Sequence, residues 1–423
     1  MPTLSFHFIH AADLHLGAAF GSIHQAAPEV AAELREATYG AFANILNYAI
    51  ENKVDFVVLA GDIYNKNENS LQPQLRFRDG LQRLHAAGIP CCVIHGNHDP
   101  HDGTTAALAW PDSCHRFPAT AAEPCVITKN GEAIAVVAGI SYGKAAVLEN
   151  LALRYTHARP DLYAVGVLHT NCGSNDNHAR YSPSTIEELK GQNFDYWALG
   201  HIHTHAVLHA VAPAVVYSGS PQGLNPKEVG PHGFCHVHVD SSHATRIQFV
   251  PAAPVLWENH TLDAAAWATE DDAIEALETF LAARAAHNSG HSILLRLTIA
   301  GRSAIHKWLS APTTQEVVLE RLRILRGNAP YVWVDRIRFD TRPELDLDKL
   351  ALAEDVLGEV LRQAHSASTE VDHSSTREQL EELFEDKRFG KILEMPEGVD
   401  LTNLLDRARL LVADRLADTG ASS

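Results

Sequence analysis

The sequence predicts an α/β protein in three parts: a large α/β domain over residues 1–250, a small α/β capping domain over 251–343 and a helical C-terminal region over 344–423. Apolar, β-rich runs alternate with helical patterns up to about residue 250, and Pro251 and Pro254 then break this alternation. A shorter α-β-α-β stretch and a charged helical tail follow. The length of 423 residues agrees with two or three domains of roughly 100–200 residues each.

Six apolar runs in the large domain are expected to be strands, at 4–12, 55–61, 90–96, 133–139, 162–169 and 195–201. Apolar residues recur at helical spacing in 29–52 and 72–88, which predicts helices between the first three runs. Nearly continuous apolar strands joined by helices indicate a buried, largely parallel sheet. Three later runs, at 213–217, 233–239 and 244–250, have no helices between them. We expect these three to be antiparallel additions that could form a second sheet packed on the first.

The capping domain is expected to contain helices at 270–287 and 313–326 and strands at 292–300 and 331–340. Beyond Pro343 the chain is charged and helical, with a polar, Ser/Thr-rich interruption near 366–376. Helices expected at 376–394 and 400–418 carry apolar residues. Docking on a partner and packing back on the cap are both open uses for these two helices.

The composition is that of a globular protein, with 46% hydrophobic and 20% charged residues, which excludes disorder. No apolar run approaches the ~18 residues of a membrane-spanning helix, and the first residues lack a secretory pattern. The six cysteines have no CxxC spacing, so reduced thiols and a cytoplasmic location are expected. The net charge of −18 disfavours unaided tight binding to phosphate backbones.

Polar side chains follow five of the expected strands at their C-terminal ends, where open α/β sheets place their sites. Seven of these residues have the character of ligands for two metal ions: Asp13, His15, Asp62, Asn97, His169, His201 and His203. Imidazole, carboxylate and amide donors favour a divalent ion such as manganese, with iron or zinc as alternatives. A carboxylate is the group best suited to bridge two cations, and Asp62 is the candidate for that role.

The order of these motifs, D-x-H, GD, GNHD, H and GHxH, resembles that of the calcineurin-like metallophosphoesterases. Four segments resemble the SbcD-type DNA repair exonucleases within that family: FIHAADLHLGAAF at the start, HTN…NHARYSPSTIEEL at 169–189, DYWALGHIHTH at 195–205 and VVYSGSPQG at 215–223. The resemblance implies a sandwich of two mixed β-sheets flanked by helices. It is strong over about residues 1–240, fits the cap in outline and is weak over the tail.

Carried over residue by residue, the resemblance implies two manganese sites and a catalytic histidine. One ion would be held by Asp13, His15, Asp62 and His203, and the other by Asp62, Asn97, His169 and His201. His98 would act on the leaving oxygen, and we expect the neighbouring Asp99 to orient its ring. Two departures stand out: Asn65 replaces a histidine that contacts substrate in some members, and the segment 224–232 is less similar than its surroundings.

The function expected from this resemblance is a DNA exonuclease of DNA repair, with endonuclease activity as an open addition. The implied partners are DNA, a coiled-coil SMC-like ATPase subunit and a second copy of the chain; no membrane is expected. A phosphatase or cyclic-nucleotide phosphodiesterase with the same metals is an alternative, and a scaffold without activity is another. His10, the aromatic residues Phe20, Tyr64 and Tyr181, and an arginine cluster on the cap have both structural and functional interpretations. That cluster comprises Arg321, Arg323, Arg326, Arg336, Arg338 and Arg342.

Overall fold

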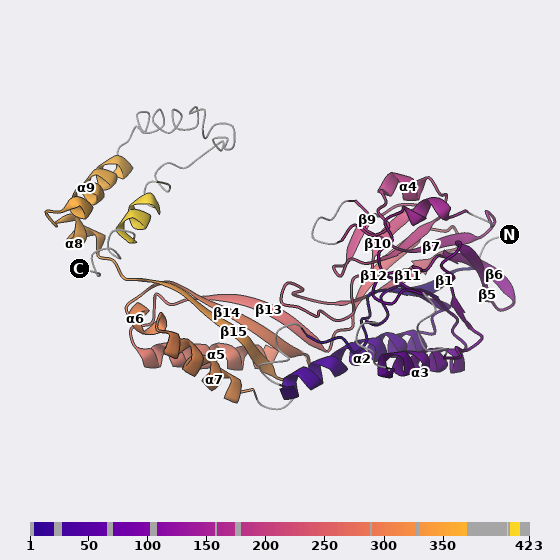
Figure 1. Ribbon diagram of the computed structural model, residues 1–423, viewed down its shortest axis with the longest axis horizontal. Coiled ribbons are helices and arrows are strands. Elements are labelled where there is room, and N and C mark those ends of the chain that lie inside the picture. Colours follow the sequence, from indigo (N-terminus) through magenta and orange to yellow (C-terminus); the bar gives the residue numbers. More distant parts are fainter. Residues whose placement is uncertain are drawn as a thin grey trace. The chain divides into compact units, whose positions relative to one another are not determined.

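The computed structural model describes residues 4–20, 28–65, 71–101, 108–156, 159–173, 179–287, 290–326, 330–369, 404 and 407–414 (Figure 1). The chain divides into two compact units. The first comprises Met1–His260, Phe280–Leu297 and Arg321–Arg336, and the second comprises Thr261–Thr279, Thr298–Glu320 and Ile337–Ser423. The domain boundaries expected at residues 250 and 343 stay a prediction.

Two six-stranded mixed sheets form most of the first unit. In the first sheet, β1 (Phe6–Ala11), β2 (Phe56–Ala60), β3 (Cys91–Ile94) and β4 (Cys114–Arg116) are parallel. On the other side of β1 lie β11 (Gly233–Val239) and then β12 (Thr245–Pro251), each antiparallel to its neighbour. The predicted α/β class with two mixed sheets flanked by helices is therefore confirmed.

The second sheet has the order β5 (Glu123–Lys129), β6 (Glu132–Gly139), β7 (Tyr163–His169), β8 (Tyr196–Gly200), β10 (Ala214–Tyr217) and β9 (Ala206–His209). Two expectations were wrong in detail. The six early runs do not share one sheet, because the last three of them belong to this one. The run at 213–217 is β10, which is parallel to β8 and antiparallel only to β9.

The main core lies between the two sheets and draws on inward-facing residues of both. Phe8 and Phe56 stack with ring centroids 4.6 Å apart, and Val137, Val165 and Val216 of the second sheet are buried in the same cluster. Full burial of each such side chain contributes about 1.5–3 kcal/mol. This packing fixes the two sheets against each other and so fixes the relation between their strand ends.

The outer face of each sheet is covered by helices. Ile9 and Ala11 alternate with the core residues of β1 and pack with the helices α2 (Pro28–Glu51) and α3 (Gln72–Ala86). Trp197 of β8 packs on the other side, near the short helices η2 (Leu151–Arg154) and α4 (Ile186–Lys190), and its Nε1–H donates to Leu189 O over 3.0 Å.

A third sheet contains β13 (Val255–Asp263), β14 (Ser292–Ser303) and β15 (Val332–Pro343), with the helices α5 (Glu270–His287), α6 (His306–Leu309) and α7 (Pro312–Ile324). The predicted α-β-α-β order recurs here, whereas β13 and α6 were not predicted. The helices α8 (Leu347–Ala351) and α9 (Val356–Thr369) follow. Residues 407–414 are helical, and the Arg302 guanidinium donates to both oxygens of Asp414 over 3.0 Å.

The helix expected at 376–394 lies outside the described residues, and the one expected at 400–418 is described only at 404 and 407–414. Among the residues that the structure describes, no helix combines the length and the apolar character needed to cross a membrane.

Candidate metal centre

The candidate ligands follow the C-terminal ends of strands from both sheets. Asp13 and His15 follow β1, Asp62 follows β2 and Asn97 follows β3, while His169 ends β7. His201 and His203 follow β8. The backbone N–H of His201 donates to both carboxylate oxygens of Asp13, each over 3.0 Å, and this contact joins the ends of the two sheets. Residues that are far apart in the sequence, such as Asp13 and His201, therefore converge at one place.

Asp62 lies between two sets of donors. Its Oδ2 is 3.8 Å from Nε2 of His15 on one side and 3.4 Å from Nε2 of His169 on the other. His15 Nε2 lies 3.2 Å from His203 Nε2, and His169 Nε2 lies 3.1 Å from Asn97 Oδ1. A carboxylate placed in this way has the geometry needed to bridge two cations.

Ligand atoms of Asp13, His15 and His203 lie within 4.8 Å of one another, as do those of Asp13, Asp62 and His169. His15, Asp62 and His98 form a third such group. Among the described residues, none of these groups includes His201. Its ring lies 5.2 Å from the His169 ring, centroid to centroid, so it borders the group rather than joining it.

Each of the four candidate histidine ligands has one ring nitrogen bonded to an oxygen acceptor. The four pairs are His15 Nδ1 with Asn65 Oδ1 at 2.8 Å, His169 Nδ1 with Ala60 O at 2.9 Å, His201 Nε2 with Ala179 O at 2.8 Å and His203 Nδ1 with Glu228 Oε1 at 2.9 Å. Carbonyl and carboxylate oxygens only accept, so each of these nitrogens carries a proton. When the ring is neutral, its other nitrogen carries the lone pair that a metal ion needs.

This protonation pattern fits divalent cations. His15 Nε2 and His203 Nε2 lie 3.2 Å apart, so when both rings are neutral and protonated on their outer nitrogens, the two lone pairs can bind one cation. A hydrogen bond to the outer nitrogen is the usual way in which proteins orient a ligating histidine. The residues present therefore fit a metal pair, and imidazole, carboxylate and amide are the donors that such ions accept.

Four candidate ligands have left-handed backbone conformations. The φ angles are +54° for Asp13, +41° for His15, +52° for Asp62 and +100° for His201. Residues other than glycine rarely adopt positive φ, and each such residue costs of order 1–3 kcal/mol. Strain concentrated at the candidate ligands indicates that the surrounding structure holds these side chains in place for a function.

Two glycines allow the chain to pass close to His169 and Asp62. A Cβ at Gly96 would lie 2.3 Å from Asp62 Oδ1, and one at Gly200 would lie 2.1 Å from Ala60 O and 2.9 Å from His169 Nδ1. Neither position accepts a side chain without displacing its neighbours. The glycines that end the predicted strands therefore make room for the donor cluster.

The pKa values of the two buried carboxylates, Asp13 and Asp62, are shifted in opposite directions. Burial raises the pKa of Asp13 from 3.8 to about 6, although His169 and His203 act against that rise. Burial alone would raise the pKa of Asp62 too, but His169, His15 and His98 hold that pKa well below its usual range. In turn, Asp62 raises the pKa of His169 against the effect of burial, whereas burial lowers the pKa of His15 to about 4.

No Lys or Arg among the described residues pairs with Asp13 or Asp62. The ion pairs of Asp62 are those with His15 and His169, and the described polar contact of Asp13 is with the backbone of His201. The positive charge beside these buried carboxylates therefore comes from histidines, and bound cations would supply more of it.

His98 is exposed, and its imidazole contacts His15 edge-to-face with ring centroids 4.8 Å apart. Its backbone N–H donates to Asp62 Oδ1 over 2.8 Å. The ring therefore stands at the solvent side of the donor cluster, where a proton donor to a leaving group would have to be. The structure supplies this position, and the catalytic role stays a prediction.

Asp99 has a different set of contacts from the expected one. Its Oδ2 accepts from the Ile63 N–H over 3.0 Å and lies 3.0 Å from His95 Nδ1, while its Oδ1 accepts from the Gly96 N–H over 2.8 Å. Asp99 is fully buried, and among its described contacts none is with the His98 ring. Its carboxylate holds the loops after β2 and β3 together instead of orienting His98.

Two residues with a role in this geometry were not assigned one from the sequence. Glu228, which positions His203, lies in the segment 224–232 that departs from the family pattern. Asn65, the other departure, positions His15. The path of a loop brings each of these two residues to its histidine. A pattern of polar residues at strand ends cannot predict such a contact.

The residues with open interpretations mostly have structural contacts. His10 is buried between the sheets, 3.0 Å from Tyr196 Oη and 3.1 Å from Leu199 O, and burial lowers its pKa to about 3. Phe20 and Tyr64 belong to apolar clusters, whereas the ring of Tyr181 lies 5.9 Å from that of His201.

In the arginine cluster, Arg323 covers the Trp333 ring at 4.8 Å and donates to two backbone carbonyls. Arg326 covers the Tyr331 ring and pairs with Glu33 over 3.5 Å. These contacts favour the structural interpretation for both arginines.

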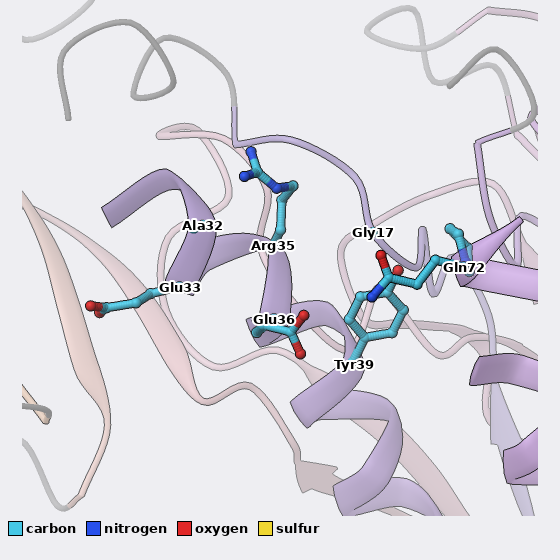
Figure 2. Close-up of a pocket in the computed structure, with 8 residues that line it drawn as sticks. Gly17, Ala32, Glu33, Arg35, Glu36, Tyr39 and Gln72 are labelled. Carbon is cyan, nitrogen blue, oxygen red and sulfur yellow. The ribbon is translucent and has the colours of Figure 1, made fainter. Parts of the chain in front are cut away.

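A hollow of about 600 Å³ near Gly17 contains none of the candidate ligands (Figure 2). Glu33, Arg35, Glu36 and Tyr39 of α2 line it together with Gln72. Two carboxylates and one guanidinium do not favour a phosphate group. The hollow is therefore separate from the chemistry of the donor cluster.

Comparison with known proteins agrees with this architecture. Residues 6–205 match the family described as calcineurin-like phosphoesterase, and residues 257–342 match the middle domain of the metallophosphoesterase YhaO. The chain belongs to the calcineurin-like metallophosphoesterases, which are hydrolases of phosphoester bonds with a two-metal site. The uncharacterized metallophosphoesterase YhaO of Bacillus subtilis is 34% identical over 351 residues, which cover 81% of this chain and 84% of that protein.

More distant relatives are two proteins named DNA double-strand break repair protein Mre11. That of Thermoplasma acidophilum is 26% identical over 196 residues, or 45% of this chain and 52% of the relative. That of Haloferax volcanii is 29% identical over 231 residues, or 53% of this chain and 48% of the relative. The family assignment is thus confirmed, whereas membership in the SbcD-type branch stays a prediction.

Proposed function

We propose that this protein is a metal-dependent DNA nuclease that hydrolyses phosphodiester bonds in DNA repair, acting primarily as an exonuclease. The proposal depends on one observation above all: an exposed imidazole, His98, stands over a buried donor cluster in which Asp62 lies between two sets of nitrogen ligands. The similarity to proteins named for double-strand break repair supports DNA as the substrate.

The ligand set proposed for one ion is Asp13, His15, Asp62 and His203, and that for the other is Asp62, Asn97, His169 and His201. Manganese is the proposed metal, because the set contains hard oxygen donors as well as imidazoles and lacks thiolates. Two such ions would polarise a phosphoryl group and acidify a bound water. Metal analysis of the purified protein tests this proposal, with iron and zinc as the competing results.

The protein's own groups supply positioning and a proton. The backbone N–H of His98 donates to Asp62, and this contact holds the residue that carries the ring beside the cluster. A protonated His98 donates its proton to the oxygen that leaves phosphorus, and solvent then reprotonates the neutral ring for the next turnover. Asn65, Ala60, Ala179 and Glu228 hold the ligand rings in place through their outer nitrogens.

A hydrolase of small phosphoesters, such as a phosphatase or cyclic-nucleotide phosphodiesterase, is the second candidate. One observation favours it: the net charge of −18 opposes the long-range attraction of a polyanion. Small substrates carry few charges and are less affected by this field.

Hydrolysis assays with manganese separate the two candidates. The substrates are end-labelled linear duplex DNA, single-stranded DNA, circular DNA, a cyclic nucleotide and a phosphomonoester. The nuclease proposal expects release of nucleotides from DNA ends, and cleavage of the circles would show endonuclease activity as well. If only the small esters are hydrolysed, the second candidate is correct. Asp62→Ala serves as the control for metal-dependent turnover, because it removes the central carboxylate.

We further propose a coiled-coil SMC-like ATPase as partner, with a dimer of this chain at its base. The acidic surface implies that another subunit supplies much of the grip on DNA. The described part of the C-terminal region exposes large apolar residues: Leu352 is 80% exposed, Val356 73% and Leu411 58%. Such residues are suited to docking. Co-purification of the ATPase with the full chain, but not with a chain ending at Pro343, is the expected result, and undiminished association would exclude docking through this region.

A further inference from the structure

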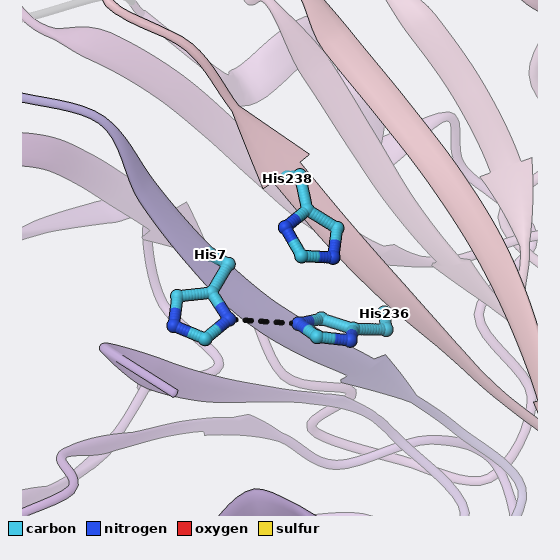
Figure 3. A group of neighbouring side chains, drawn as sticks. All are labelled: His7, His236 and His238. Atoms are coloured by element: carbon cyan, nitrogen blue, oxygen red, sulfur yellow. Dashed lines mark hydrogen bonds between the residues drawn. The ribbon is translucent and has the colours of Figure 1, made fainter. Parts of the chain in front are cut away.

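A second group of imidazoles lies on the first sheet, away from the candidate metal centre. His7 of β1 is directly opposite His238 of β11, and His236 is two residues before His238 on the same strand (Figure 3). Side chains two apart on a strand, and side chains directly opposite each other, share one face of a sheet. From His7 to Ala11 at the other end of β1 is about 13 Å of strand, and the candidate centre lies beyond that end.

The three rings converge closely. His7 Nδ1 lies 2.8 Å from His236 Nε2, and the ring centroids of His236 and His238 are 4.1 Å apart. One nitrogen of each ring lies within 4.8 Å of the others (Figure 3). Ligand nitrogens around a tetrahedral zinc ion, with bonds of about 2.0–2.1 Å, are about 3.4 Å apart. Small side-chain rotations therefore suffice to place three nitrogens around one ion.

Two of the rings have a polar partner on the nitrogen that faces away from the group. The hydroxyl of Tyr48, on α2, lies 3.0 Å from His236 Nδ1. His7 Nε2 faces Asp55 Oδ2 at 3.9 Å, and this carboxylate also accepts from the His7 N–H over 2.9 Å. A hydrogen-bond partner such as Tyr48 orients a ligating histidine, whereas Asp55 lies too far from His7 Nε2 for a hydrogen bond and acts through its charge. His7 Nδ1 and His236 Nε2 are hydrogen-bonded to each other, and when both outer nitrogens carry the ring protons, both inner nitrogens present lone pairs to an ion.

The environment favours the neutral forms of His236 and His238, and a hollow reaches His7 and His238. Burial lowers the pKa of His236 to about 4 and lowers that of His238, and Arg246 beside them acts in the same direction. Lys129 pairs with Asp55 over 3.1 Å, so part of the local positive charge is balanced. A hollow of about 590 Å³, lined by His7, His238, Lys129 and Arg246 among others, gives access from solvent.

We propose that His7, His236 and His238 bind one divalent transition-metal ion of the zinc class, with water from the adjacent hollow in the fourth position. Three imidazoles without a carboxylate ligand favour zinc, nickel or copper over the manganese proposed for the other centre. The bound ion joins β1 to β11 and, through Tyr48, both strands to α2. A hydrogen bond between His7 and His236, together with packing of the three rings, is the competing explanation, and it requires no metal.

Zinc binding to the full-length protein tests this proposal. The protein is freed of metal, equilibrated at buffered free zinc concentrations and analysed by mass spectrometry for bound zinc. His7→Ala/His238→Ala should bind one equivalent fewer than the wild type, whereas His85→Ala, which removes an exposed imidazole of α3, should bind the same amount. Equal stoichiometry and affinity in the double variant and the wild type would overturn the proposal.

Tyr48→Phe provides a sharper readout, because it keeps the ring that packs on Phe234 and removes only the hydroxyl. It should retain the zinc stoichiometry but weaken the site about 10–100-fold. If ring packing alone explains the cluster, Tyr48→Phe and wild type will have the same zinc affinity.

The double variant could lose zinc because it misfolds. The single variant His238→Gln is the control for this, since His238 is only partly buried. It should lose the same equivalent of zinc while its manganese-dependent hydrolysis stays at the wild-type rate. Loss of that hydrolysis together with the zinc would show that the two centres are not independent and would contradict the proposal.

Discussion

At the scale of single residues, the candidate centre depends on the hydrogen bonds that orient the candidate histidine ligands as much as on the ligands themselves. Strand-end polar residues could be predicted from the sequence, because apolar runs end abruptly at Asp13, Asp62, Asn97 and His169. The carboxylate behind His203 could not, since Glu228 reaches that ring through the path of a loop.

Replacing His98 tests the division between metal binding and proton transfer. His98→Ala should keep the wild-type content of bound metal, because the backbone N–H that anchors the loop to Asp62 is unchanged. Its turnover should fall about 10²–10⁴-fold, the usual contribution of a general acid. Metal analysis and steady-state kinetics on the same preparation measure both effects. Turnover near that of the wild type would remove His98 from the mechanism.

The raised pKa of Asp13 predicts how the stability of the metal-free protein depends on pH. Its pKa rises from 3.8 to about 6 on folding, so the folded state binds more protons than the unfolded state between these pH values. Stability associated with this group is therefore present below about pH 4 and is lost as the pH rises through about 6. Asp13→Asn removes the effect, and asparagine tolerates the left-handed backbone at this position.

In a chelating buffer, Asp13→Asn should be more stable than the wild type at pH 7 by on the order of 1–3 kcal/mol, with a much smaller difference at pH 4. Urea denaturation at the two pH values measures this. The opposite shift of Asp62 is present in both proteins and largely cancels. A difference that is the same at both pH values would contradict the assignment. Manganese should reverse the order of stability, because it binds the wild type more tightly.

At the scale of elements, the apolar runs predicted most strands and helices to within a few residues. The helix expected at 270–287 is α5, Glu270–His287, and the strand expected at 233–239 is β11. The pairing of strands was harder to predict, because an apolar run indicates a buried strand without indicating which sheet contains that strand. The chain enters β10 from the hairpin with β9, yet β10 also pairs with β8 in parallel, a relation that depends on tertiary packing.

The turn after β3 can be tested through Gly96. In Gly96→Ala, the new Cβ would begin 2.3 Å from Asp62 Oδ1, so the carboxylate must move. We expect a loss of metal affinity of at least about tenfold and a destabilisation of about 1–3 kcal/mol. Gly191→Ala is the matched control, because its φ is −67° and the nearest contact of its Cβ is 3.4 Å. Calorimetric titration with manganese compares the two, and equal affinities would show that the turn is not tightly packed on Asp62.

At the scale of the whole molecule, the net charge of −18 sets a limit on how the protein holds DNA alone. Each phosphate contact adds about 0.9 to the slope of log affinity against log salt on duplex DNA. We expect the isolated chain to show a slope smaller than about 3 in magnitude, because few basic residues can contact the backbone. Apparent KM for a linear duplex, measured from low to moderate salt, gives this slope. If log affinity falls steeply with log salt for the chain alone, the chain makes many phosphate contacts itself and no partner is required for DNA binding.

The position of the centre across both sheets has a consequence for how the protein matures. The first sheet carries Asp13, His15, Asp62 and Asn97, whereas the second carries His169, His201 and His203, so neither sheet alone supplies all the proposed ligands of either ion. Cations should therefore bind tightly only after the two sheets have packed together. Bound cations should then slow unfolding and leave the rate of folding nearly unchanged. In stopped-flow experiments, manganese should slow the unfolding limb while leaving the refolding rate nearly constant. Ion loading would then report that the nascent chain has completed its tertiary assembly.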